Sequence, residues 1–169
     1  TDAQGLAYYD ELTGLANRRL LTEHMEYILD ISKREHRHGA LLFIDLDNFK
    51  TLNDSRGHAA GDDLLKQVAE SLKQVFRAAD TIARLGGDEF VILSGHLEDS
   101  EEDVINQIHS LMLKLRHVLG EKFIVQGESY HLTASVGITT FPSMAVSPEI
   151  LMKQADTAMY RAKEAGRDG

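Results

Sequence analysis

The apolar positions of this chain follow two spacings, one typical of amphipathic helices and one typical of buried strands. Across residues 18–38 they recur every three or four positions, which predicts a helix that ends near Gly39. The continuous apolar run ALLFIDL at 40–46 predicts a buried strand. The polar segment 47–61 is expected to be a loop, followed by a second amphipathic helix over about 62–80.

A hairpin is predicted next. The runs TIARL at 81–85 and EFVIL at 89–93 have the length and composition of strands, and two glycines separate them. Glycine tolerates the positive φ angles of a tight turn, so the two glycines are expected to form the loop. With that loop, Arg84 would lie opposite Glu89 on the neighbouring strand.

The rest of the chain continues the alternation of helices and strands. Apolar residues at helical spacing over 104–115 predict a third helix, with Ile105 on its buried side. Strands are expected at 122–126 and 130–141, and a last helix at 147–165. This order predicts an α/β (α+β) sandwich, in which helices cover a central mixed, largely antiparallel sheet with a βαββαβ core.

Composition narrows the classes of function. A chain of 169 residues is most simply one domain, and its formal net charge of −9 argues against DNA or RNA as a partner. The absence of cysteine excludes disulfides and thiolate metal sites. No apolar run approaches the ~20 residues of a membrane span, so this domain is expected to make no direct membrane contact.

Carboxylates gather where two of the predicted strands end. Asp45 closes the first strand, Asp47 follows two positions later, and Asp88 and Glu89 belong to the hairpin. Acids at one sheet edge repel each other unless a cation lies between them, and oxygen ligands favour magnesium or manganese over zinc. Metal-assisted phosphoryl transfer uses such an arrangement. Taken separately, the same acids could serve only as turn and strand-end residues.

Cations and polar side chains suited to a nucleotide lie near these acids in the sequence. Lys50 follows the first strand, and Lys163 and Arg167 are four positions apart on the last helix, where they could instead interact with the helix carboxyl end. Asn53 and Asp62 could together recognise the edge of guanine. Their structural alternatives are a turn residue and a helix cap.

Several ordered motifs identify a family. GGDEF stands at 86–90, DELTGLANRR begins at Asp10, LDNFKTLNDSRGHAAGDDLL spans 46–65, and ADTAMYRAKEAGR spans 155–167. With these motifs the chain resembles the GGDEF-domain diguanylate cyclases over nearly its whole length. The resemblance implies a fold similar to the adenylyl cyclase catalytic core and the polymerase palm. It also implies that two domains face each other, each holding one GTP, and together form cyclic di-GMP and pyrophosphate.

The resemblance assigns roles to residues at matching positions. Asp45, Asp88 and the backbone carbonyl of Leu46 would bind Mg²⁺ or Mn²⁺, two ions for each half-site, with Glu89 as a further acid beside the metal and the reacting hydroxyl. The other assignments are Gly86 and Gly87 for the hairpin turn, Arg84 for orienting Glu89, Asn53 and Asp62 for guanine, and Lys50, Lys163, Arg167 and the backbone amides of Asn48 and Phe49 for phosphates.

An RxxD pattern lies just before the hairpin. Arg77 and Asp80 match the product-inhibition site of the family by their position five residues before the first glycine of GGDEF. The resemblance implies that they bind cyclic di-GMP. The structural alternative is an ion pair at i, i+3 near a helix end.

The resemblance favours an active homodimeric diguanylate cyclase with feedback inhibition. One alternative is a catalytically silent GGDEF module that binds GTP or cyclic di-GMP as a sensor, although the acids and glycines that such modules usually lose are present. A polymerase-like or adenylyl-cyclase-like transferase is a third, less favoured interpretation.

The chain is expected to be a single GGDEF domain, residues 1–169, from a longer multidomain signalling protein, with residues 1–9 as the end of an interdomain linker. A domain that uses GTP is expected to face the cytoplasm, whether the parent protein is cytosolic or membrane-anchored.

Overall fold

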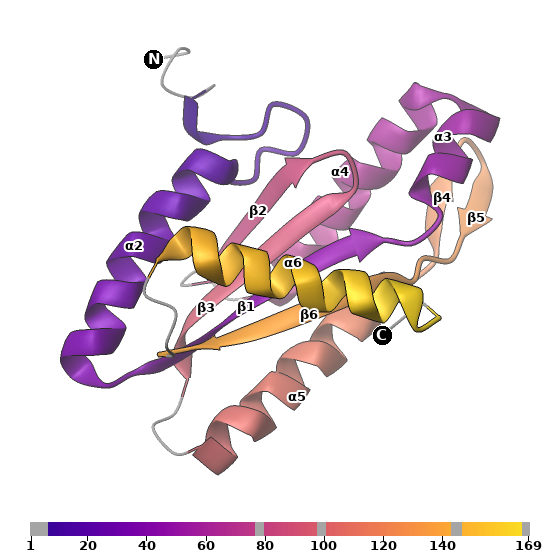
Figure 1. Cartoon of the computed structure of the whole chain (residues 1–169). Coiled ribbons are helices and arrows are strands. Elements are labelled where there is room, and N and C mark those ends of the chain that lie inside the picture. The colour runs from indigo at the N-terminus through magenta and orange to yellow at the C-terminus, as the bar shows by residue number, and fades with distance from the viewer. Residues whose placement is uncertain (1–6, 77–79, 98–100, 143–146, 167–169) are drawn as a thin grey trace.

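The computed structural model describes residues 7–76, 80–97, 101–142 and 147–166. A four-stranded sheet lies between layers of helices, with a small hairpin beside it (Figure 1). The strands are β1 (His38–Leu46), β2 (Thr81–Gly86), β3 (Glu89–Leu97), β4 (Phe123–Val125), β5 (Glu128–Tyr130) and β6 (Ala134–Phe141). The helices are α2 (Arg18–Glu35), α3 (Phe49–Arg56), α4 (His58–Val75), α5 (Glu101–Leu119) and α6 (Pro148–Glu164). The predicted fold class is confirmed.

The main sheet has the order β2-β3-β1-β6, and β4 pairs with β5 in the separate hairpin. The pairings of β1 with β3, β1 with β6 and β2 with β3 are antiparallel. A parallel bridge between Ala16 and Ala83 adds the mixed character at the β2 edge. In this register Asp45 lies opposite Glu89 of β3 and Ser135 of β6. The end of β1 therefore has β3 on one side and β6 on the other.

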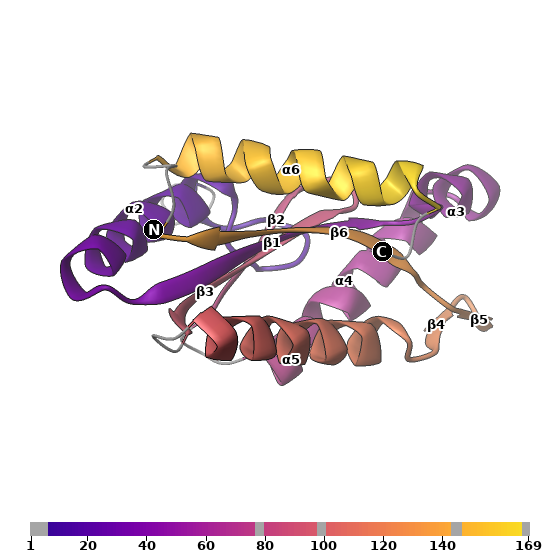
Figure 2. The same ribbon diagram turned by 60° about the horizontal axis from the view of Figure 1, so that its bottom comes forward.

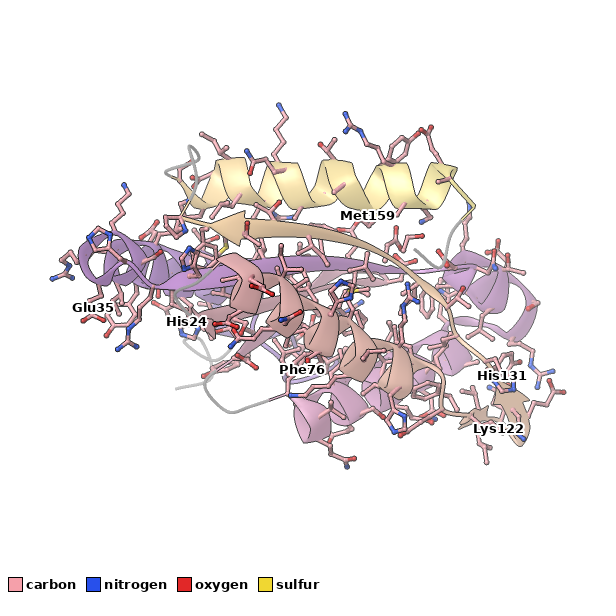
Figure 3. All side chains as sticks on the ribbon, turned by 90° about the horizontal axis from the view of Figure 1, so that it is seen from below. His24, Glu35, Phe76, Lys122, His131 and Met159 are labelled. Atoms are coloured by element: carbon pink, nitrogen blue, oxygen red, sulfur yellow. The ribbon has the colours of Figure 1, made fainter. Side chains whose placement is uncertain are left out.

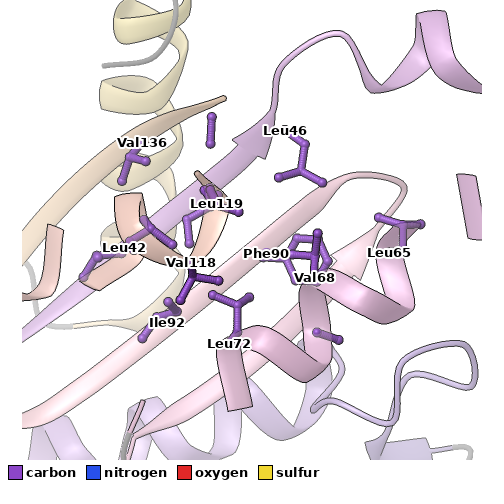
Figure 4. Packing of buried hydrophobic residues seen from close by; sticks show 14 of the residues in the cluster. Leu42, Leu46, Leu65, Val68, Leu72, Phe90, Ile92, Val118, Leu119 and Val136 are labelled. Carbon is purple, nitrogen blue, oxygen red and sulfur yellow. The ribbon is translucent and has the colours of Figure 1, made fainter. Parts of the chain in front are cut away.

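Both faces of β1 are buried. Leu42 and Ile44 pack in a cluster with α4 and α5, whereas Leu41 and Phe43 pack in a second cluster with α2 and α6. Figure 2 shows α5 and α6 on opposite faces of the sheet, and Figure 4 shows the first cluster from close by. Because side chains alternate along a strand, a strand covered on both faces must be apolar throughout. This explains the continuous run that predicted β1.

Helix α6 lies close on β6. A Cβ added at Gly137 would meet the carbonyl oxygen of Ala155 at 2.0 Å, so only glycine permits this approach. Met159, which is 4% exposed, points from α6 toward the sheet (Figure 3). The close contact fixes the height of α6 above the sheet and brings its last turns over the end of β1.

The expected loop over 47–61 is wrong, because this segment forms α3 and the start of α4. Phe49 and Leu52 are the buried residues of the eight-residue α3, and they lie one turn apart. Two apolar positions are too few to reveal a helical period in the sequence. Gly57, with φ of 93°, separates the two helices.

The predicted hairpin loop is also wrong by one residue. Gly87 and Asp88 form the turn, and Gly86 pairs with Glu89. An irregularity between Arg84 and Gly86 shifts the register, so Arg84 lies opposite Phe90. The bulge accommodates the extra residue and places Asp88 at the tip of the hairpin.

Several boundaries differ from the predictions. Helix α2 ends at Glu35, three residues early, because His36 adopts a left-handed conformation with φ of 55°. Helix α4 ends at Val75 rather than near residue 80. The expected strand over 130–141 is divided between β5 and β6. Ile105 is 52% exposed instead of buried.

None of the helices in the described ranges is long and apolar enough to cross a bilayer.

Candidate functional site

Two aspartates meet where β1 ends beside the β2–β3 turn. Asp45 is 8% exposed, and its carboxyl group lies close enough to that of Asp88 to act on its charge. The backbone N–H of Leu46 donates to the carbonyl oxygen of Asp88 at 3.2 Å, which ties the turn to β1. Burial, followed by the nearby carboxyl group of Asp45, raises the pKa of Asp88 to about 7. A cation between the two carboxyl groups would stabilise their ionised forms.

Lys163 supplies a positive charge to this pair from α6. Its Nζ donates to Oδ2 of Asp45 at 2.6 Å, and the two side chains are 26% and 12% exposed. The other oxygen, Oδ1 of Asp45, is buried without a hydrogen-bond partner among the residues that the structure describes. A buried carboxylate oxygen normally has a partner, so this atom is a candidate metal ligand.

The donor set suits a metal ion that arrives with phosphate. Within the described part of the chain, no group of three or more His, Asp or Glu side chains is arranged to hold a metal. Mg²⁺ usually keeps several waters and binds through one or two carboxylates together with substrate phosphates. Asp45 and Asp88 provide that number of carboxylates, so the residues present fit such an ion.

Glu89 lies directly opposite Asp45 on β3 and lines a pocket. Burial raises the pKa of Glu89, and the negative charges of Asp45 and Asp156 raise it further, whereas Arg18 and Lys163 lower it. The pocket has a volume of about 380 Å³ and lies between α2 and α6. Its lining includes Arg18, Thr22, Phe43, Glu89, Met152, Lys153 and Asp156. A carboxyl group with a raised pKa beside open space is suited to accept a proton.

The expectation that Arg84 orients Glu89 is corrected by the contacts of its guanidinium. Arg84 Nη1 forms a salt bridge of 2.9 Å with Oδ1 of Asp10, and Nε donates to the carbonyl oxygen of Gly87 at 2.9 Å. The shifted register places Glu89 opposite Gly86, outside the row of Arg84. Arg84 therefore holds the turn itself, at the residue before Asp88.

Asp10 and Thr13 support that turn, and sequence reasoning assigned them no role. Oδ2 of Asp10 accepts from the backbone N–H and the hydroxyl of Thr13 at 3.0 and 2.7 Å. With both oxygens paired, Asp10 is oriented toward Arg84. The available signal was the DELTG segment, whose acid and hydroxyl lie three residues apart.

Asp47 is structural, although it lies two positions after Asp45. Its carboxylate accepts from the hydroxyls of Thr133 at 2.7 Å and Ser135 at 2.9 Å. Its backbone N–H donates to the carbonyl oxygen of Thr133 at 2.9 Å. These contacts join the end of β1 to the start of β6.

Comparison with known proteins identifies the family. The protein-family model described as "Diguanylate cyclase, GGDEF domain" matches residues 7–169 of this chain. The chain belongs to the GGDEF-domain family. It is 41% identical over 164 residues to the bifunctional diguanylate cyclase/cyclic di-GMP phosphodiesterase MucR of Pseudomonas aeruginosa, covering 97% of this chain and 23% of MucR. It is 40% identical over 172 residues to the diguanylate cyclase DgcP of the same species, covering 99% and 24%.

The fold of this GGDEF domain is also found in solved structures. A sensory box/GGDEF family protein from Caulobacter crescentus superimposes with a TM-score of 0.87 at 35% identity, covering 94% of this chain and 99% of that one. The chain spans less than a quarter of the length of MucR and DgcP.

The GGDEF domain places the predicted guanine-binding residues on neighbouring helices. Asn53 lies on α3, and its buried Oδ1 has no hydrogen-bond partner. A Cβ at Gly61 would lie 1.7 Å from that oxygen, so the Asn53 side chain lies against the first turn of α4. Asp62 is the next residue of α4 and is exposed. The structure thus brings the amide and the carboxylate to the same pair of helices.

The predicted phosphate-binding residues are only partly described. Asn48, with φ of 62°, precedes α3, and Lys50 is exposed in the first turn of that helix. Lys163 contacts Asp45, as described above. Arg167 lies outside the described residues.

The predicted inhibitory site is separate from the acid pair. Asp80 precedes β2 and lines a pocket of about 640 Å³ that also includes Phe76, His24 and Tyr27. Arg77 lies outside the described residues. The contacts of the RxxD pair therefore stay a prediction.

Proposed function

We propose that this GGDEF domain is a diguanylate cyclase, which condenses two GTP molecules into cyclic di-GMP and two pyrophosphates. The observation that carries the proposal is the placing of Asp45 beside Asp88, with the Lys163 ammonium on one oxygen of Asp45 and the other oxygen buried and without a partner among the described residues. A metal ion would give that oxygen a partner, and phosphoryl transfer uses one. The name of DgcP, a relative at 40% identity, supports the same reaction.

The acid pair would hold Mg²⁺ or Mn²⁺ together with the carbonyl of Leu46, two ions for each half-site. Bound there, the metal would neutralise phosphate oxygens and lower the pKa of the attacking hydroxyl. Glu89 accepts the proton of the ribose 3′-hydroxyl. The hydroxyl oxygen then bonds to the α-phosphorus of the second GTP, and the bond from that phosphorus to pyrophosphate breaks. The raised pKa of Glu89 supports this role, because a more basic carboxylate is the better proton acceptor.

The remaining site residues would bind the nucleotide. Asn53 and Asp62 recognise the amide edge of guanine. Oδ1 of Asn53 supports this assignment, because a buried amide oxygen without a partner among the described residues can accept from a ligand N–H once the side chain turns toward it. The triphosphate is held by Lys50, Lys163, Arg167 and the backbone amides of Asn48 and Phe49. A protein with a net charge of −9 needs such local cations to retain a polyanion.

One domain supplies half of a two-substrate site, so catalysis requires a homodimer. The rate per protomer should therefore rise with protein concentration until dimers saturate. Product inhibition would act through Arg77 and Asp80. The domain would work in the cytoplasm, where its substrate GTP is found.

The test uses nucleotide-stripped protein at high concentration with GTP and Mg²⁺, followed by mass spectrometry of the products, with Asp88→Ala in parallel. Cyclic di-GMP from the unchanged protein alone supports the proposal. Tight binding of GTP or cyclic di-GMP without product, even at concentrations where dimers are detected, would instead identify a silent sensor module. Primed nucleic acid and ATP serve as substrate controls.

A further inference from the structure

We propose that Lys163 is a resident counter-cation of the acid site and makes metal binding conditional on the triphosphate. In the nucleotide-free protein the ammonium partly neutralises the acids and repels a divalent ion. When a triphosphate arrives, the ammonium moves to it and the acids accept the metal. This inference rests on the proposed function.

The contacts of Lys163 place its charge among the residues expected to bind metal. Its Nζ lies 2.6 Å from Oδ2 of Asp45, in a pair that is mostly shielded from water. Asp45 in turn lies beside Asp88 and opposite Glu89 in the sheet register. A single ammonium therefore serves three carboxyl groups.

Charge counting shows why a metal alone is disfavoured. Carboxylates bind a metal in their ionised form, and in that form Asp45 and Asp88 carry two negative charges, which a divalent ion would balance if Lys163 were absent. With the ammonium in place, the same ion leaves an excess positive charge, and two cations at short range repel strongly where little water screens them. The negative charges of a triphosphate remove this excess and give the ammonium a new partner.

The side chain of Lys163 is suited to this exchange. A lysine carries a compact charge on a flexible four-carbon stem, so it can reorient while the backbone stays in place. Helix α6 itself is held on the sheet at Gly137. The movement would be confined to one side chain. Metal and nucleotide would then bind with positive coupling, and each would tighten the other by the same factor.

The experiment measures Mn²⁺ binding to the full chain by electron paramagnetic resonance, without nucleotide and then with 3′-deoxy-GTP. This nucleotide has an intact triphosphate but no attacking hydroxyl, and the Mn²⁺ that it binds in solution is subtracted. Lys163→Met should tighten Mn²⁺ binding by the nucleotide-free protein about tenfold, within the usual range of coupling between sites. The nucleotide should tighten Mn²⁺ binding about tenfold in the unchanged protein and have little effect in the variant.

A matched control is available on the same helix. Arg161→Met removes one positive charge two residues away, and Arg161 is exposed and directed to another face of α6. It should leave the Mn²⁺ affinity close to that of the unchanged protein. Asp45→Asn should weaken Mn²⁺ binding and so assign the signal to this site.

Weaker or unaltered Mn²⁺ binding in Lys163→Met overturns the inference and makes the lysine a support for Asp45. Lys163→Gln is measured beside it, with circular dichroism to compare folding. The product assay separates this outcome from a failure of the proposed function. An active protein whose Lys163→Met variant binds Mn²⁺ unchanged loses only the inference. An inactive protein whose variant binds Mn²⁺ more tightly retains it and loses the cyclase activity.

Discussion

The hairpin side of the candidate site and the α3–α4 side differ in how firmly the protein holds the residues expected to act. On the hairpin side, a half-buried chain of contacts runs from Asp10 through Arg84 to the carbonyl oxygen of Gly87, next to Asp88. On the α3–α4 side, the buried oxygen of Asn53 has no partner and Asp62 is exposed. The acids on the hairpin side are held by contacts within the protein, whereas Oδ1 of Asn53, which we propose to bind guanine, has no such partner among the described residues.

This difference has a physical basis in charge. Two carboxyl groups at one place repel each other, so they stay together only where burial, hydrogen bonds and a nearby ammonium compensate. A neutral amide over a glycine needs no such support. We therefore expect substitutions on the hairpin side to affect catalysis, and those on the α3–α4 side to affect nucleotide affinity.

The largest expected effect comes from the acid pair itself. Asp45→Asn should lower the rate of cyclic di-GMP formation by roughly a thousandfold, comparable to the loss of one key stabilising group in other active sites. It should also lower the pKa of Asp88 below about 7, because the charge of Asp45 contributes to the raised value. A pH titration of the Asp88 carboxyl group, monitored by nuclear magnetic resonance, measures that pKa. An unchanged pKa would mean that burial alone sets it.

Arg84→Lys should lower kcat by roughly ten- to a hundredfold and leave KM for GTP nearly unchanged. Lysine can keep the ion pair with Asp10, but it lacks the fork that reaches Gly87 at the same time. Steady-state kinetics separate the two constants.

Arg34→Lys is the control for Arg84→Lys, because this exposed arginine lies on α2 and pairs with Asp30. If Arg84→Lys raised KM and spared kcat, the separate roles of the two sides would be wrong.

Gly61→Ala should weaken GTP binding about tenfold and leave the kinetics of the bound complex almost intact. The new Cβ would overlap Oδ1 of Asn53 at 1.7 Å and displace the amide. Calorimetry with 3′-deoxy-GTP gives the affinity. Gly61 is buried, so the added methyl group has to displace Asn53 to fit, and a stable variant with unaltered affinity would show that Asn53 moves without consequence.

The smallest expected effect is a dependence of stability on pH. The folded-state pKa of Asp88 is about 7, against 3.8 for an unperturbed aspartate, so the folded state binds this proton more tightly. Its contribution is fully present below pH 3.8 and is lost as pH rises through 7. Since Asp88 is only about half buried, the effect should be about 1 kcal/mol after allowance for solvent screening.

Asp88→Asn removes this titration. Urea unfolding of nucleotide-free protein should therefore show the variant gaining stability relative to the unchanged protein between pH 5 and pH 8. A constant difference in stability across that range would contradict the raised pKa of Asp88.

The pattern of hydrophobic positions predicted much of the fold, and the predictions that were wrong have identifiable physical causes. Strand β1 was predicted well because burial on both faces leaves an apolar run without interruption. Helix α3 was missed because only Phe49 and Leu52 pack inward, too few to show a period. The hairpin register failed because a bulge beside Leu85 adds one residue, and local sequence does not specify a bulge.

The sequence by itself determined the family and the fold class, and it singled out Asp45 and Asp88 as candidate metal ligands. Ordered motifs and hydrophobic periods are local properties of a chain, so they can be recognised without the structure. Only the tertiary structure decided how those residues are paired. Lys163 reaches Asp45 across 118 residues, Arg84 turns to Asp10 across 74, and Asp47 is held by Thr133 across 86. Such contacts arise because α6, β6 and the segment that contains Asp10 and Thr13 all pack around the end of β1 and the neighbouring hairpin. A periodic pattern records which face of an element is buried, but it carries no record of which side chain from a distant element will meet it.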